Sequence, residues 1–148
     1  MLASIAFITI MFLQPAQAQL LKLEVVYAEW KEVDDAGGQP PRNFQKVCEV
    51  SLSLNVGDQK ASTGKKTDCL EMKLEASANS CRGDVVELVT EMRVKALSEK
   101  DSDRYPSISS FRDKTYKANE WHMVSSVTRE GAVHGFLIRI AETKSPRP

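Results

Sequence analysis

The sequence has few of the residues from which catalytic and metal sites are built. Two histidines, His122 and His134, occur in 148 residues, and aromatic residues make up 7% of the chain. It contains no paired Cys/His array and no H-E-x-x-H motif for zinc. The motifs G-x-S-x-G, G-x-G-x-x-G and G-x-x-x-x-G-K-[ST] are absent as well. The sequence therefore predicts no metal, no cofactor and no catalytic site of these kinds.

An excess of charge of one sign is also lacking. The 20 Lys and Arg residues balance the 20 Asp and Glu residues. A dedicated surface for nucleic acid or for anionic membranes needs a basic excess, so neither partner is expected. No long hydrophobic run follows the one at the start of the sequence, and we expect no membrane span after it.

The first eighteen residues have the pattern of a signal peptide. An apolar run from Leu2 to Leu13 is followed by Gln14-Pro15 and then by Ala16-Gln17-Ala18, the small-x-small pattern of a signal-peptidase site. The run is short for a helix that spans a bilayer. No Lys or Arg precedes it, which departs from the usual pattern. We expect cleavage after Ala18 and a mature protein that is periplasmic or secreted.

Alternation of apolar and polar residues dominates the remaining chain. Alternating stretches that predict strands lie near 21–30, 108–116, 121–128 and 136–140. We also expect residues 48–56 and 70–78 to form a long hairpin around a turn at Thr63–Lys66. About seven strands predict an all-β domain over residues 19–142, an antiparallel β-sandwich or small barrel, with a flexible tail over 143–148.

Residues 85–97 fit two kinds of structure. Val86, Leu88 and Met92 alternate as in a strand, but the spacing of Leu88 and Met92 also fits a helix capped by Asp84. Valine is frequent here and the neighbouring segments are strands, which favours a strand. One helix at this place is the alternative.

Three cysteines, Cys48, Cys69 and Cys81, would meet an oxidising compartment after export. In the expected hairpin Cys48 faces Ser80, so a Cys48–Cys81 disulfide is favoured. A Cys69–Cys81 disulfide is the alternative if the second strand is broken, because a straight strand holds these ends about 30 Å apart and a bridge needs about 6 Å. In a third interpretation Cys48 is simply a small buried hydrophobe.

Most aromatic residues are expected to fill the core or to close its ends: Trp30, Tyr105, Phe111, Tyr116, Trp121 and Phe136. Trp30 and Tyr105 become candidate contact residues if they lie in loops, because Trp and Tyr dominate the energetics of interfaces. The longest expected loops, Asp34–Pro41 and Ser98–Pro106, contain four acidic candidates. These are Asp34, Asp35, Asp101 and Asp103.

Three segments near the end of the sequence, Pro106–Arg112, Thr115–Val124 and Phe136–Ile140, combine a strand, a short turn and a final apolar strand. This order is similar to the β-rich end of bacterial secretins. The v-v-G-G-L strand of that family corresponds here to Met123–Val127, where the paired glycines are missing. The chain is also too short for a ring-forming pore. The resemblance implies a component of envelope assembly with secretin-like hairpins rather than an enzyme.

These observations favour an exported module that binds another envelope or secreted macromolecule and performs no chemistry. One alternative is a small secreted hydrolase in which Cys69 or a serine is the nucleophile and His122 or His134 is the base. Another alternative is an exported inhibitor of a hydrolase.

Overall fold

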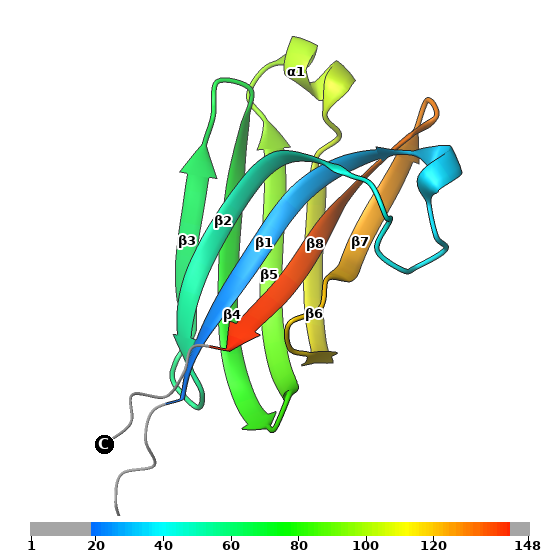
Figure 1. Ribbon diagram of the computed structural model, residues 1–148. Coiled ribbons are helices and arrows are strands. Elements are labelled where there is room, and N and C mark those ends of the chain that lie inside the picture. The colour runs from blue at the N-terminus through cyan, green and yellow to red at the C-terminus, as the bar shows by residue number, and fades with distance from the viewer. Residues whose placement is uncertain (1–18, 143–148) are drawn as a thin grey trace, which may run out of the picture.

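The computed structural model describes residues 19–142, which form two antiparallel four-stranded sheets that face each other (Figure 1). Sheet A has the order β2-β1-β8-β7 and sheet B has the order β3-β4-β5-β6. The predicted β-sandwich is confirmed, with eight strands. The predicted signal peptide and the predicted tail lie outside the described residues. The strands are β1 (Leu20–Lys31), β2 (Gln45–Asn55), β3 (Ala61–Lys66), β4 (Leu70–Arg82), β5 (Val85–Ala96), β6 (Ile108–Lys117), β7 (His122–Arg129) and β8 (Ala132–Glu142).

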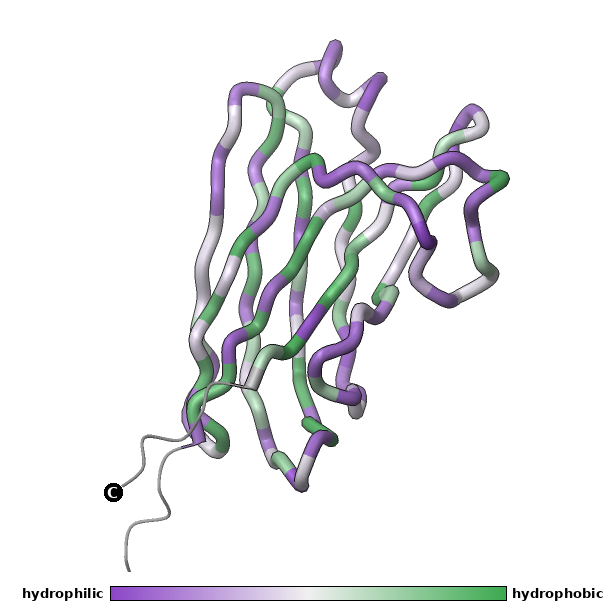
Figure 2. The backbone as a smooth tube through the Cα atoms, viewed as in Figure 1, coloured by the Kyte–Doolittle hydropathy of each residue, from purple (hydrophilic) through white to green (hydrophobic). Residues whose placement is uncertain are grey.

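Alternate residues of both sheets fill the core between them, and the alternation is visible along the strands in Figure 2. Each large aliphatic side chain that is fully buried in this way stabilises the fold by roughly 1.5–3 kcal/mol relative to an exposed one. Tyr116 and Phe136 are buried there as expected, but Phe111 is 62% exposed on the outer side of sheet B. The inner residues of the two central strands of sheet A are Leu21, Leu23, Val25, Tyr27, Phe136, Ile138 and Ile140.

The two central strands of sheet A, β1 and β8, are buried on both of their faces. Val25 and Tyr27 point into the core between the sheets, whereas their neighbours Val26 and Ala28 belong to a second apolar cluster. The outer face of an antiparallel sheet is usually polar because it faces water. An apolar cluster on that face therefore needs cover from residues outside the two strands. We call Val26, Ala28, Trp30, Val133 and Leu137 the outer cluster.

The predicted hairpin between residues 48–56 and 70–78 is wrong. Strand β2 pairs with β1 in sheet A, and β4 pairs with β3 in sheet B. Gly64, expected in a turn, lies inside β3 opposite Lys73. Alternation does not reveal β3, because its sequence ASTGKK has no large apolar residue and is exposed along most of its length.

Residues Val85–Ala96 form strand β5, which confirms the favoured interpretation of this segment. The alternative helix at 85–97 is therefore wrong. A short helix, α1, instead occupies Glu99–Arg104, within the segment expected to be a polar loop. A single 3-10 turn, η1 (Glu32–Asp34), follows β1.

The predicted Cys48–Cys81 disulfide is also wrong, because all three cysteines are unpaired. Buried Cys48 lies in sheet A opposite Tyr27. Cys81 lies in sheet B, at the end of the sandwich where the Gln19 side-chain amide donates a hydrogen bond to its sulfur (3.2 Å). Gln19, which contacts Cys81, and Tyr27, which lies opposite Cys48, are separated by about 25 Å of extended chain. The two cysteines are therefore several times farther apart than a bridge allows. Cys69 immediately precedes β4 and Cys81 lies near the far end of this continuous strand, which rules out the alternative pairing as well.

Glu130 and Gly131 form the two-residue turn between β7 and β8, and both have positive φ (53° and 80°). Hairpin turns of type I′ need positive φ at both central positions, which favours Asn or Gly. We expect Glu130→Asn to raise the free energy of unfolding by about 0.5–1 kcal/mol, because Asn tolerates left-handed backbone better than Glu does. Urea denaturation measures the gain. Glu130→Ala is the control and should bring none; equal effects of the two variants would contradict the explanation.

Gly135 allows the outer cluster to lie close to the backbone of sheet A. A Cβ atom at this position would lie 2.7 Å from the backbone oxygen of Ser125 and 2.8 Å from the ring of Trp30. We expect Gly135→Ala to lower the free energy of unfolding by about 1–3 kcal/mol through overpacking.

The control for this variant is Gly64→Ala, where the nearest contact of the added Cβ is 3.0 Å, to the backbone oxygen of Met72. Its loss of stability in the same urea titration should be clearly smaller. A Gly135→Ala protein as stable as the parent would show that Trp30 does not depend on close approach to the sheet.

Candidate functional site

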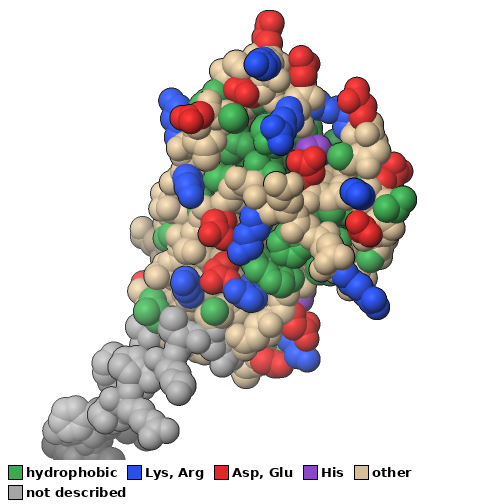
Figure 3. Space-filling model, turned by 45° about the horizontal axis from the view of Figure 1, so that its top comes forward, with side chains coloured by type: hydrophobic (Ala, Val, Ile, Leu, Met, Phe, Trp, Pro, Cys, Tyr) green, Lys and Arg blue, Asp and Glu red, His purple; other side chains and the backbone are tan. Residues whose placement is uncertain are grey.

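Two aromatic side chains cover the middle of the outer face of sheet A. Phe44 immediately precedes β2 at one edge of the sheet, and Trp121 immediately precedes β7 at the other. The two rings meet edge-on, with centroids 6.0 Å apart and an interplanar angle of 75°. Both rings, together with Met123, are partly buried against the outer cluster. Figure 3, which looks towards this face and the top of the sandwich, shows hydrophobic side chains grouped among charged ones.

Arg139 fixes Trp121 in place. Its guanidinium carbon lies 4.6 Å from the centroid of the Trp121 ring. The guanidinium also donates a hydrogen bond from Nε to Glu24 Oε2 (2.8 Å), and its Nη2 forms an ion pair with the same oxygen (2.6 Å). Strands β1 and β8 place Glu24 directly opposite Arg139. A charge-assisted pair combined with a cation–π contact leaves Trp121 little freedom, so the ring is pre-organised before any partner arrives.

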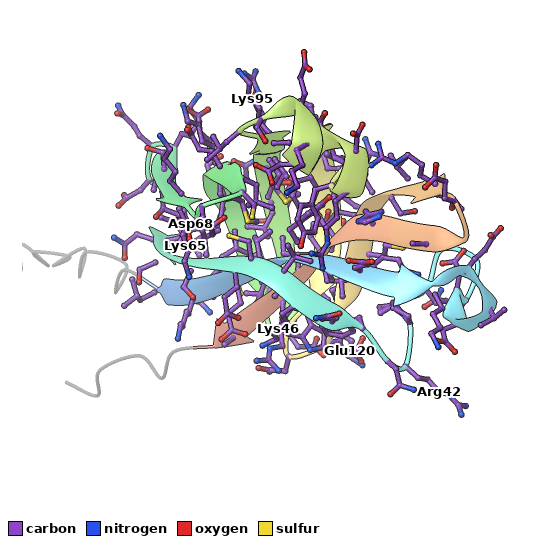
Figure 4. All side chains as sticks on the ribbon, turned by 90° about the horizontal axis from the view of Figure 1, so that it is seen from above. Arg42, Lys46, Lys65, Asp68, Lys95 and Glu120 are labelled. Atoms are coloured by element: carbon purple, nitrogen blue, oxygen red, sulfur yellow. The ribbon has the colours of Figure 1, made fainter. Side chains whose placement is uncertain are left out.

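Surface hollows lie on both sides of this aromatic pair. One hollow of about 470 Å³ lies beside Phe44, and another of about 200 Å³ lies beside Trp121. Lys46 and Glu120 lie on this side of the sandwich, whereas Lys95 lies on the opposite side (Figure 4). An apolar centre with a polar rim is the usual composition of a macromolecular interface. The larger hollow is lined by Glu29, Trp30, Lys31, Asp34, Asn43, Phe44, Gln45 and Ala132.

The two aromatic residues expected at the surface, Trp30 and Tyr105, lie inside the protein instead. Trp30 is 4% exposed within strand β1, and its indole N–H donates to Asp35 Oδ1 (3.3 Å). Tyr105 is 9% exposed and folds back from the end of α1 onto Tyr27, with ring centroids 6.5 Å apart. The expectation that these two residues are contact anchors is therefore corrected, because neither ring lies in an exposed loop.

The four acidic candidates lie in two separate segments, one after β1 and the other in α1. Asp34 lines the larger hollow beside Phe44, and Asp35 accepts the hydrogen bond of Trp30. Asp101 belongs to the start of α1, where its backbone N–H donates to the Ser98 hydroxyl (3.1 Å) and its carboxylate accepts from the same hydroxyl (2.8 Å). The backbone oxygen of Asp103 accepts from the guanidinium at the end of β7. Asp34 is thus the candidate that borders the aromatic pair.

The two histidines do not form a common site. His122 of β7 lies opposite Ile138 of β8, and His134 lies four residues before Ile138 on β8. The two histidines are thus on the order of 13 Å apart along the hairpin. The Nε2 atom of His122 lies 2.7 Å from the backbone oxygen of Lys117. His134 is 3% exposed and stacks on Tyr27, with ring centroids 6.2 Å apart. Within residues 19–142 no group of three or more His, Cys, Asp or Glu residues could hold a metal ion.

Burial lowers the pKa of His134 below its ordinary value, although the nearby Glu29 opposes this effect. Its Nδ1 atom has no hydrogen-bond partner within the described part of the chain. Burial also raises the pKa of the Tyr27 hydroxyl, which donates a hydrogen bond to the backbone oxygen of Pro106 (3.1 Å). This end of the core therefore holds a neutral histidine packed against the rings of Tyr27 and Tyr105.

No protein-family model and no curated protein sequence matches this chain. Among the helices in residues 19–142, none has the length and apolar character needed to cross a membrane.

Sequence reasoning missed Phe44 and Arg139 and placed Trp121 in the core. A usable signal exists in the two unbroken apolar runs Val25–Ala28 and Phe136–Ile138. Such runs indicate strands that are covered on both faces, so a second cover of aromatic residues has to come from elsewhere in the chain.

We expect acid to weaken the fold through His134. An unfolded histidine titrates near pH 6.5, and the folded pKa is lower, so between the two values the unfolded chain alone binds the proton. The free energy of unfolding contributed in this way is present above about pH 6.5 and is lost as the pH falls towards the folded pKa.

Urea denaturation between pH 7.5 and 5 checks this expectation, with His134→Phe as the test variant and His122→Gln as the control. The loss of stability in acid should shrink in His134→Phe and persist in His122→Gln. An unchanged acid dependence in His134→Phe would show that other groups cause it.

Proposed function

We propose that this chain is an exported, non-enzymatic β-sandwich module that binds another envelope or secreted macromolecule through the outer face of sheet A. The observation that carries the proposal is the aromatic pair of Phe44 and Trp121, locked over the outer cluster by Arg139. The signal-peptide pattern of residues 1–18 supports export.

The residue types on this face support binding rather than simple exposure to water. Trp, Phe, Met and Arg are enriched at interfaces, and Trp and Arg are frequent hot spots. Here Arg139 keeps a side-chain exposure of 40% although it contacts both the Glu24 carboxylate and the Trp121 ring. A rigid aromatic side chain loses little conformational entropy on binding, which raises affinity.

The extent of the face supports a macromolecular partner. The larger hollow reaches Trp30 and the smaller one reaches Glu24, six residues earlier on β1. A ligand that contacts both hollows spans about 20 Å along the strand, more than a small metabolite covers. Charged side chains around the smaller hollow include Lys22, Lys46 and Glu49, which provide a polar rim.

We expect Trp121→Ala to weaken partner binding at least about tenfold, since truncation of a hot-spot tryptophan typically costs about 2 kcal/mol or more. The mature chain, residues 19–148, serves as crosslinked bait in its native envelope and secreted fractions. Captured proteins are identified by mass spectrometry, and affinity is then measured with the purified partner.

The matched control is Phe111→Ala, which removes a more exposed aromatic side chain from the opposite sheet. It should leave binding unchanged. Urea denaturation of both variants separates lost binding from lost folding. Equal effects of the two variants on binding, or recovery of the bait alone, would contradict the proposal.

A further inference from the structure

On the outer face of sheet B, two neighbouring rows of like charge run across the strands, and we call these rows bands. Lys73 of β4 lies directly opposite Arg93 of β5, and Glu75 lies directly opposite Glu91. These four side chains line one surface hollow of about 330 Å³ and are 36–68% exposed. Like charges directly opposite each other destabilise a sheet. The arrangement is therefore unfavourable for a single chain in water.

Ion pairs within the chain relieve this repulsion in part. Lys73 pairs with Glu71 (3.2 Å) and Arg93 pairs with Glu91 (2.8 Å), each within one strand. Lys60 pairs with Glu75 (3.1 Å). Such exposed pairs contribute little to stability because water and salt screen them. Because such pairs are weak, the four side chains can exchange these partners for opposite charges on another chain.

The residues beside the bands differ in size. Gly64 of β3 and Ser109 of β6 extend the basic band, opposite Lys73 and Arg93 respectively. Phe111 extends the acidic band, opposite Glu91, and is largely exposed. The basic band thus ends in small residues on both sides, whereas the acidic band ends in Ser62 on β3 and in an exposed aromatic ring on β6.

We propose that the outer face of sheet B binds a second copy of this chain, with a two-fold axis that runs across the strands between the two bands. Rotation about this axis exchanges the bands. It places Lys73 over Glu75 of the second copy and Arg93 over Glu91 of the second copy, and the same pairs recur by symmetry. The same rotation places Ser109 over Phe111 of the second copy, so a small residue meets a large one.

The charge pattern selects this arrangement over the other face-to-face dimer. A two-fold axis parallel to the strands, between β4 and β5, would place Lys73 over Arg93 and Glu75 over Glu91 of the second copy. Both contacts are repulsive. Complementary charges fix the relative orientation of two partners at an interface. Here the basic band of one copy faces the acidic band of the other only when the axis runs across the strands.

The size of the face predicts a modest dimer. A face that is four strands wide and ten residues long covers roughly 600 Å² in each chain. This area lies at the low end of specific interfaces, so the association should be reversible and sensitive to salt. The outer faces of sheet A point away from each other in this dimer, and the inference is therefore independent of the proposed function.

Sedimentation velocity of the mature protein at high protein concentration tests the dimer directly. We expect dimers at low ionic strength and monomers at about 0.5 M salt, where charges are screened within a few ångströms. A wild-type protein that stays monomeric at low ionic strength would overturn the proposal.

A charge exchange tests the arrangement. The variant Lys73→Glu/Arg93→Glu makes both bands acidic, and Glu75→Lys/Glu91→Lys makes both bands basic. Each variant alone should be monomeric, and an equimolar mixture of the two should form a heterodimer. Circular dichroism verifies that both variants fold.

Arg42→Glu/Lys46→Glu is the matched control, because it changes the net charge equally on the side of sheet A (Figure 4). It should dimerise like the wild type. Dimerisation of either sheet B variant by itself, or a mixture that stays monomeric, would show that the bands are not the contact surface. Loss of the dimer in the control would show that net charge, rather than the bands, governs association.

Discussion

The burial of strands β1 and β8 on both faces is the constraint on which the rest of this structure depends. Their inner residues fill the space between the sheets, and their outer residues form a second apolar cluster. Phe44 and Trp121, which precede the two edge strands, reach over that cluster and meet above it. Gly135 leaves room for Trp30 beneath them. The aromatic surface of sheet A is thus a direct consequence of how its central strands are covered.

The two outer faces of the sandwich differ in their chemistry. The face of sheet A has an aromatic centre that Arg139 and Glu24 hold rigid. The face of sheet B is polar and includes one basic and one acidic band. One fold therefore presents two chemically different surfaces, and we propose a foreign macromolecule for the first and another copy of the chain for the second.

Much of the fold follows from local sequence. Alternation predicts the β-sandwich and most strand positions, and the abundance of valine predicts strand β5. Pairing between distant strands is not encoded in alternation. Strand β3 lacks the pattern altogether, so the sequence predicts a hairpin between β2 and β4 that does not form. The disulfide predicted from that hairpin is wrong for the same reason, because its two cysteines lie in different sheets.

The candidate site is harder to predict than the fold. Composition does not distinguish a tryptophan that fills the core, such as Trp30, from one that covers an outer face, such as Trp121. The distinction depends on which strands are central in a sheet, which is a property of long-range topology. The contacts of Arg139 depend equally on the register of β1 and β8.

Hydrogen–deuterium exchange of residues 19–148, alone and bound to a captured partner, tests the central claim most directly. The account predicts slower exchange in the bound state for residues 44–51 and 121–126, which border the aromatic pair, with strand β5 unchanged. Slower exchange confined to strands β3 to β6 would contradict the assignment of the binding face to sheet A.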